Sequence, residues 1–101
     1  MSKRYQSFKE FYPYYLSEHK NRYCRLWHVA GTFFVILIFL MSILARNAWY
    51  LLLMPVVGYG FAWIAHFFFE KNRPATFEYP LFSLLGDFVM FKDVLLGRVK
   101  I

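Results

Sequence analysis

Two long apolar runs constrain this chain most. Residues 26–45 and 48–69 hold 20 and 22 residues without a single Asp, Glu, Lys or Arg. A helix of about 20 apolar residues spans the roughly 30 Å hydrocarbon core of a bilayer. The long helices of so small a soluble domain should each show a polar face, and neither run shows one. We therefore predict an integral membrane protein, with two buried helices of a soluble bundle as the alternative.

The link between the two runs is only Arg46 and Asn47, so we expect an antiparallel hairpin that turns at residues 45–48. All other lysines and arginines lie in residues 1–25 and 71–101. By the positive-inside rule, both termini then face the cytoplasm. The membrane would be the inner membrane of a bacterium or the endoplasmic reticulum of a eukaryote. No cleaved signal peptide is expected, because the first run begins late, is long and is followed at once by a second.

The net charge of +6 has a membrane explanation. The basic residues bracket the apolar runs, where they would meet anionic lipid headgroups. We therefore predict a membrane lipid partner and no nucleic-acid partner. The oligomeric state is not indicated by any pattern in the chain.

The flanking segments predict two further helices. Ser7 and Glu10 form a capping box, and an aromatic stripe at helical spacing follows. This helix would lie on the membrane surface, pack on the end of the bundle, or do both. Residues 81–96 are apolar but interrupted by charges, and are short for a span. They predict a shallow or re-entrant helix on the cytoplasmic side, with a third crossing as the alternative. The fold class is thus all-α, a single membrane-embedded domain over residues 1–101, with Pro74 ending the second span.

Three histidines are candidates for chemistry. His28 is the third residue of the first run and His66 is the fourth from the end of the second. An antiparallel hairpin places both at the same depth, near the cytoplasmic interface. Glu70 lies four residues after His66, on the same helix face if the helix is regular. His19 joins them only if the chain breaks between His19 and His28, and the polar residues 20–22 are a suitable place.

These residue types suit a metal ion. Neutral imidazole is the commonest transition-metal ligand, and two histidines with a carboxylate are typical of iron(II) oxygenases. Zinc accepts the same ligands. In the alternative interpretation, the histidines are interfacial hydrogen-bonding groups and Glu70 pairs with Lys71 or Arg73. Ionisable residues inside membrane segments are nonetheless functional candidates.

Three other polar residues have open roles. Cys24, the one cysteine, lies four residues before His28 and is a free thiol or a further ligand. Glu18 is expected to be solvated. Asp87 is either an acceptor for a metal-binding histidine or a polar group on a helix face.

The same residues carry a resemblance to a known family. FYPYYLSEHKNRYCRLWHVAGT, residues 11–32, and GYGFAWIAHFFFEKNRPATFEYPLFSLLGDFVMF, residues 58–91, resemble the small membrane family of 2-hydroxy fatty acid dioxygenases. The resemblance covers roughly residues 5–95. Its most specific elements are two. One is the pair Glu18-His19, with His28 nine residues after His19, and the other is the run from Ala65 to Ala75. Ala65 departs from the family pattern, which commonly has glycine there.

The resemblance implies an iron(II)-dependent α-oxidation that shortens a 2-hydroxy fatty acid by one carbon with dioxygen. It implies that His19, His28 and His66 are the essential metal-binding histidines. Arg73 is a candidate for holding the substrate carboxylate, because guanidinium matches a carboxylate in a bidentate contact. Two competing functions stay open: a zinc-dependent lipid-modifying hydrolase, and a non-enzymatic structural hairpin.

Overall fold

The computed structural model describes residues 5–73 and 77–101, and all regular secondary structure among these residues is helical, with no strand. The elements, in chain order, are α1 (Phe8–Ser17), α2 (Arg22–Ala45), the 3₁₀-helix η1 (Ala48–Leu52), α3 (Leu53–Ile64), the π-helix η2 (Ala65–Glu70) and α4 (Pro80–Leu95). The all-α prediction is confirmed. The predicted helix stop at Pro74 lies outside the described residues, as do the basic residues Lys3 and Arg4.

The first arm of the hairpin, α2, begins earlier than the apolar run. The side chain of Asn21 accepts hydrogen bonds from the backbone N–H groups of Tyr23 (2.8 Å) and Cys24 (3.3 Å). This cap satisfies two of the N–H groups that a helix start leaves without partners. The helix ends at Ala45, where Arg46 takes the left-handed conformation with φ 52°. The tight turn at residues 45–48 was predicted correctly.

The second arm is not one regular α-helix. It starts as η1, capped by the Asn47 side chain, continues as α3 and ends as the π-helix η2. Lys71 then closes the arm in the left-handed conformation with φ 60°. The π-helical turn was not predicted, and it carries His66. Such turns widen a helix locally and are frequent at functional sites.

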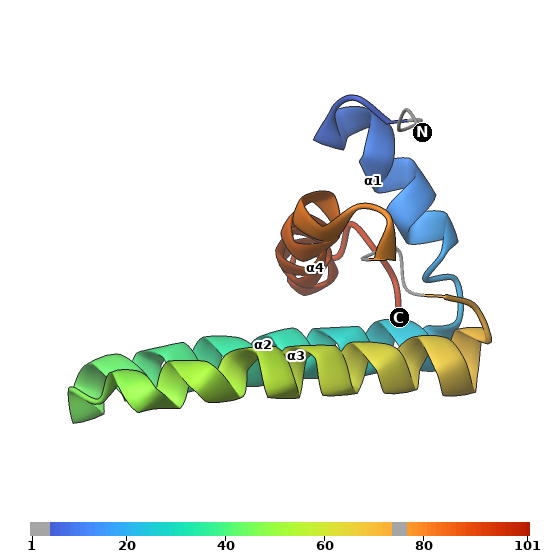
Figure 1. Ribbon diagram of the computed structural model, residues 1–101. Coiled ribbons are helices and arrows are strands. Elements are labelled where there is room, and N and C mark those ends of the chain that lie inside the picture. The colour runs from blue at the N-terminus through green and yellow to red at the C-terminus, as the bar shows by residue number, and fades with distance from the viewer. Residues whose placement is uncertain (1–4, 74–76) are drawn as a thin grey trace.

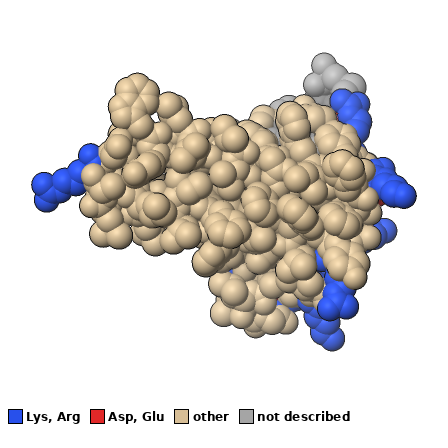
Figure 2. Space-filling view, turned by 90° about the horizontal axis from the view of Figure 1, so that it is seen from below, with Lys and Arg blue, Asp and Glu red and all other residues tan. Residues whose placement is uncertain are grey.

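The two arms lie side by side along their whole length (Figure 1). At Gly31 a Cβ atom would lie 2.6 Å from the Cβ of Phe61, so only glycine permits this contact. Both arms are long and apolar enough to cross a membrane. In the most apolar 18-residue stretch of each arm, only 22% (first arm) and 11% (second arm) is buried. The outer face of the hairpin is apolar, with Lys and Arg side chains only at its ends (Figure 2).

Helices α1 and α4 lie on one face of the hairpin, with α4 between α1 and the two arms (Figure 1). Ser7 caps α1 by accepting from the N–H of Glu10 at 3.3 Å, as the capping box predicted. Phe11, Tyr15, Tyr79 and Met90 form a buried core between α1 and α4. The aromatic stripe of α1 therefore packs within the bundle, while its contact with a membrane surface stays a prediction.

Helix α4 spans Pro80–Leu95, close to the predicted residues 81–96. It exposes a stripe of large apolar residues, Leu81, Leu84, Leu85 and Phe88. These positions recur at helical spacing, so the stripe is one continuous face.

Candidate metal centre

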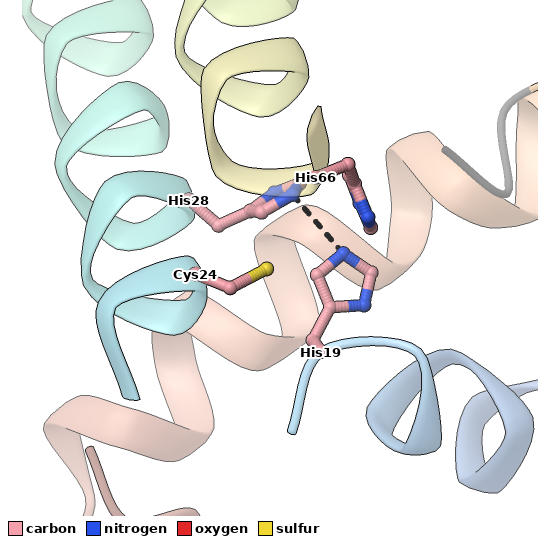
Figure 3. Close-up of side chains that lie close together, drawn as sticks. All are labelled: His19, Cys24, His28 and His66. Carbon is pink, nitrogen blue, oxygen red and sulfur yellow. Dashed lines mark hydrogen bonds between the residues drawn. The ribbon is translucent and has the colours of Figure 1, made fainter. Parts of the chain in front are cut away.

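The structure brings the three histidines together with Cys24. One ligand atom from each of the four residues lies within 4.8 Å of the other three, and all four side chains are buried. Figure 3 shows their side chains converging from three segments of the chain. Cys24 and His28 lie in the first two turns of α2, and His66 lies in η2. His19 lies after α1, in the short break before α2. Such a break between His19 and His28 was the condition under which we expected His19 to join the other two histidines.

Each imidazole is held by its Nδ1 atom. His19 Nδ1–H donates to the backbone carbonyl of Tyr15 at 2.6 Å. His66 Nδ1–H donates to Asn72 Oδ1 at 2.7 Å. His28 Nδ1 lies 3.3 Å from Asp87 Oδ1. Metal-binding histidines usually donate their other ring N–H to a carbonyl or carboxylate in this way, which fixes the tautomer and the orientation of the ring.

The acceptors are themselves held in place. Asn72 donates through Nδ2 to the backbone carbonyl of Glu18 at 3.1 Å, which fixes its Oδ1 as the acceptor for His66. The hydroxyl of Tyr15 donates to Asp87. Burial, followed by the charge of Asp87, raises the pKa of Tyr15 well above its ordinary value, so the phenol keeps its proton. Asp87 is therefore fixed by Tyr15 on one side and His28 on the other.

These anchors leave the Nε2 atoms as lone-pair donors. His19 Nε2 and His28 Nε2 lie 3.0 Å apart. With both Nδ1 atoms protonated and both rings neutral, two lone pairs face each other, and a metal ion or a proton shared between them makes this arrangement favourable. Burial, and then the neighbouring His28 and His66, lower the pKa of His19 well below its ordinary value. The neutral ring is the form that binds metals. The arrangement therefore fits a metal ion.

The fourth member of the cluster widens the choice of metal. Cys24 is completely buried and is the free thiol of the described chain. Imidazole suits iron, zinc, copper and nickel, whereas thiolate favours zinc, copper(I) and iron–sulfur clusters. The donor types alone are thus compatible with both iron and zinc.

The two other predicted site residues, Glu70 and Arg73, are not members of the four-residue cluster, although the carboxylate of Glu70 lies beside Cys24. The carboxylate of Glu70 accepts from the backbone N–H of Asn21 at 2.7 Å and is not part of the four-residue cluster. The guanidinium of Arg73 is exposed and lies 5.4 Å from the ring centre of Phe77. The roles of Glu70 as a ligand and of Arg73 in substrate binding stay predictions.

A cavity of about 320 Å³ opens beside the histidines. All three histidines line it, as do Tyr15 and Asp87. Its remaining walls come from α2, α3 and α4 and are mostly apolar: Thr32, Val35, Met54, Pro55, Gly58, Tyr59, Ala62, Ser83, Leu84 and Phe88. An apolar pocket with a few convergent polar groups is the usual form of a small-molecule site.

Comparison with known proteins identifies a family. The family model described as 2-hydroxy-palmitic acid dioxygenase Mpo1-like matches residues 5–99, which is nearly the whole chain. No curated protein and no solved structure gave a significant match.

Proposed function

Because this chain belongs to the Mpo1-like family, we propose that it is a metal-dependent dioxygenase that shortens 2-hydroxy fatty acids by one carbon. One observation carries the proposal. Three buried imidazoles are each anchored through Nδ1 and turned toward one point beside an apolar cavity. A structural role for histidines requires no such convergence of lone pairs.

The proposed metal ligands are His19, His28 and His66. The proposed ion is iron(II), which when bound would supply the redox chemistry with dioxygen that the family name implies. Asn72 and Asp87 would hold the rings of His66 and His28 in the metal-binding tautomer. Loss of either anchor would leave a ring free to rotate away from the ion.

The cavity supports a fatty acid as the substrate. Its apolar walls on α2, α3 and α4 would surround an acyl chain and exclude water, while its polar end lies at the histidines. The overall reaction balances without an external reductant. One 2-hydroxy acid and one dioxygen give the acid shortened by one carbon, one carbon dioxide and one water. Arg73 stays a candidate for the first contact with the substrate carboxylate, because its guanidinium is exposed.

We further propose that the hairpin crosses a membrane, with the metal centre near one surface. The large exposed apolar area of both arms supports this, since soluble proteins rarely expose so extended an apolar face. His28 and His66 lie at the open end of the hairpin, where the basic flanking segments begin and end. A fatty acid would then reach the cavity directly from the bilayer.

A zinc enzyme is the second candidate, and Cys24 favours it. A thiolate beside three imidazoles is a donor set that zinc accepts readily, and zinc has no redox chemistry. Such an enzyme would hydrolyse a lipid rather than oxidise one. Metal identity separates the two candidates.

The test is metal content, measured on detergent-purified protein prepared without oxygen. Wild type is compared with His28→Gln and His66→Gln, and with Arg73→Gln as a control outside the cluster. We expect near-stoichiometric iron in wild type and Arg73→Gln. Both histidine variants should lose at least about nine tenths of it, because loss of a residue that only orients a ligand already costs about 10-fold to 100-fold in metal affinity, and these variants lose a ligand itself. Oxygen consumption with 2-hydroxypalmitate, yielding pentadecanoate, would complete the assignment. Stoichiometric zinc would favour the hydrolase, and absence of any metal would overturn the proposal.

A further inference from the structure

Ser83 of α4 is a buried hydroxyl without a partner. Its residue is 5% exposed, and its Oγ makes no hydrogen bond within the described chain. Burying a hydroxyl without a hydrogen bond is unfavourable, so native proteins rarely retain one unless it serves a purpose. The residue lines the same cavity as the three histidines. The unpartnered hydroxyl therefore belongs to the wall of a site.

The position of Ser83 relates it to the metal centre. Ser83 and Asp87 lie four residues apart on α4, so they occupy the same helix face one turn apart. Asp87 contacts His28, and both residues line the cavity. Ser83 thus lies one turn from the carboxylate that orients a proposed metal ligand.

The cavity is elongated along the hairpin. On α3 and η2 its lining runs from His66 back to Met54, about 18 Å at a rise of 1.5 Å per residue. On α2 it runs from His28 to Val35. The walls beyond the histidines and Ser83 are largely apolar. A long site with polar groups at one end matches a molecule that has one polar end and an extended hydrocarbon chain.

We propose that the cavity binds a fatty acid lengthwise, with its polar end hydrogen-bonded to Ser83 Oγ and its chain extended toward Met54 and Pro55. This inference rests on the proposed function and adds to it a substrate-positioning residue and a determinant of chain length. Ser83 contacts the substrate and not the metal ligands. Met54 marks the far end of the chain site.

The first test replaces Ser83 with Ala and measures binding rather than turnover. Purified full-length protein with its own metal is kept anaerobic, so that no substrate is consumed. Binding of radiolabelled 2-hydroxypalmitate and of radiolabelled palmitate is measured at equilibrium. We expect the dissociation constant to rise about fivefold to tenfold, the effect of one lost hydrogen bond. Ser17→Ala, at an exposed position outside the cavity, should bind as wild type does.

The two acids distinguish which polar group Ser83 binds. Weaker binding of both acids assigns the contact to the carboxylate, and weaker binding of the hydroxy acid alone assigns it to the 2-hydroxyl. Either result supports the proposal. The thermal midpoint of Ser83→Ala should equal or exceed that of wild type, because the removed hydroxyl has no partner in the folded protein. Unchanged affinity, or reduced affinity with a lowered midpoint, would overturn it.

The second test is Met54→Trp, which fills the far end of the cavity. We expect weaker binding of 2-hydroxypalmitate, by about fourfold for each methylene displaced, and unchanged binding of 2-hydroxyoctanoate. Equal effects on both chain lengths, or none, would contradict the lengthwise placement. If wild type binds neither acid, the proposed function fails as well. If wild type binds and oxidises the hydroxy acid, and neither Ser83→Ala nor Met54→Trp changes fatty-acid binding, only this inference fails.

Discussion

At the scale of single residues, the candidate centre depends on atoms that are not in the cluster itself. Asn72 joins two parts of the molecule. It accepts from His66 through Oδ1, donates to the carbonyl of Glu18 through Nδ2, and donates its own backbone N–H to the carbonyl of His66 at 3.1 Å. It therefore holds the His66 ring and also ties the end of the second arm to the segment that carries His19.

Replacing Asn72 with Ala should release the His66 ring. We expect metal affinity to fall about 10-fold to 100-fold, the usual effect of losing such an anchor, while the helical content is kept. Chelator competition followed by metal analysis measures it. Asn47→Ala is the matched control, because Asn47 caps η1 at the opposite end of the hairpin. It should cost about 1 kcal/mol of stability and leave metal affinity unchanged. Equal metal affinity in both variants would refute the anchoring role of Asn72.

The sequence was informative about the histidines and less so about their anchors. The convergence of His28 and His66 follows from an antiparallel hairpin, and that of His19 from the polar break at residues 20–22. No role at the site was assigned to Asn72 from the sequence, and Asp87 had two open roles. Their contacts depend on the left-handed turn at Lys71 and on how α4 packs, which no local pattern specifies. Cys24, an open candidate, proved to lie inside the cluster.

At the scale of elements, the contact between α1 and α4 holds the site closed on one side. A Cβ atom at Gly86 would lie 2.8 Å from the ring of Tyr15. The absence of a side chain there lets Tyr15 reach Asp87 and lets its backbone carbonyl hold His19. One small residue on α4 thus permits two contacts that orient the histidines.

Gly86→Ala should therefore destabilise the fold by about 1–2 kcal/mol, because a buried ring must shift. Metal affinity should fall as well, because the carbonyl of Tyr15 holds His19 and its hydroxyl holds Asp87, which contacts His28. Gly60→Ala is the control, because a Cβ atom there meets nothing within 4 Å. It should be neutral or stabilising by up to about 1 kcal/mol, the helix preference of alanine. Thermal unfolding in detergent and metal titration measure both effects. A Gly86→Ala protein as stable as Gly60→Ala would contradict this account of the packing.

Element ends were easier to predict than element geometry. Ser7 was identified as a cap because its side chain acts on neighbouring residues, and it caps α1 as expected. The π-helical turn at Ala65–Glu70 was not foreseen, because a run that is apolar on every side gives no periodicity from which a change of helix type is visible.

At the scale of the whole molecule, Arg25 ties the C-terminal segment to the start of the first arm. Its Nε–H donates to the carbonyl of His19 at 2.5 Å, and its guanidinium also donates to the carbonyl of Lys100 at 2.8 Å. Residues near Lys100 therefore lie beside the open end of the hairpin (Figure 1). If the hairpin crosses a membrane, this contact places the C-terminal segment on the same side as α1, which argues for a shallow or re-entrant α4 rather than a third crossing.

The topology is tested with single cysteines in a Cys24→Ser background. Lys9→Cys, Lys100→Cys and Asn47→Cys proteins are placed in sealed vesicles of known orientation and treated with a membrane-impermeant maleimide. We expect Lys9→Cys and Lys100→Cys to be labelled from one side and Asn47→Cys only from the other. Labelling after detergent permeabilisation serves as the control for reactivity. If α4 crossed the membrane completely, Lys100→Cys would be labelled together with Asn47→Cys. Labelling of all three from one side would instead mean that the hairpin does not span the bilayer, and that its apolar face is covered in another way.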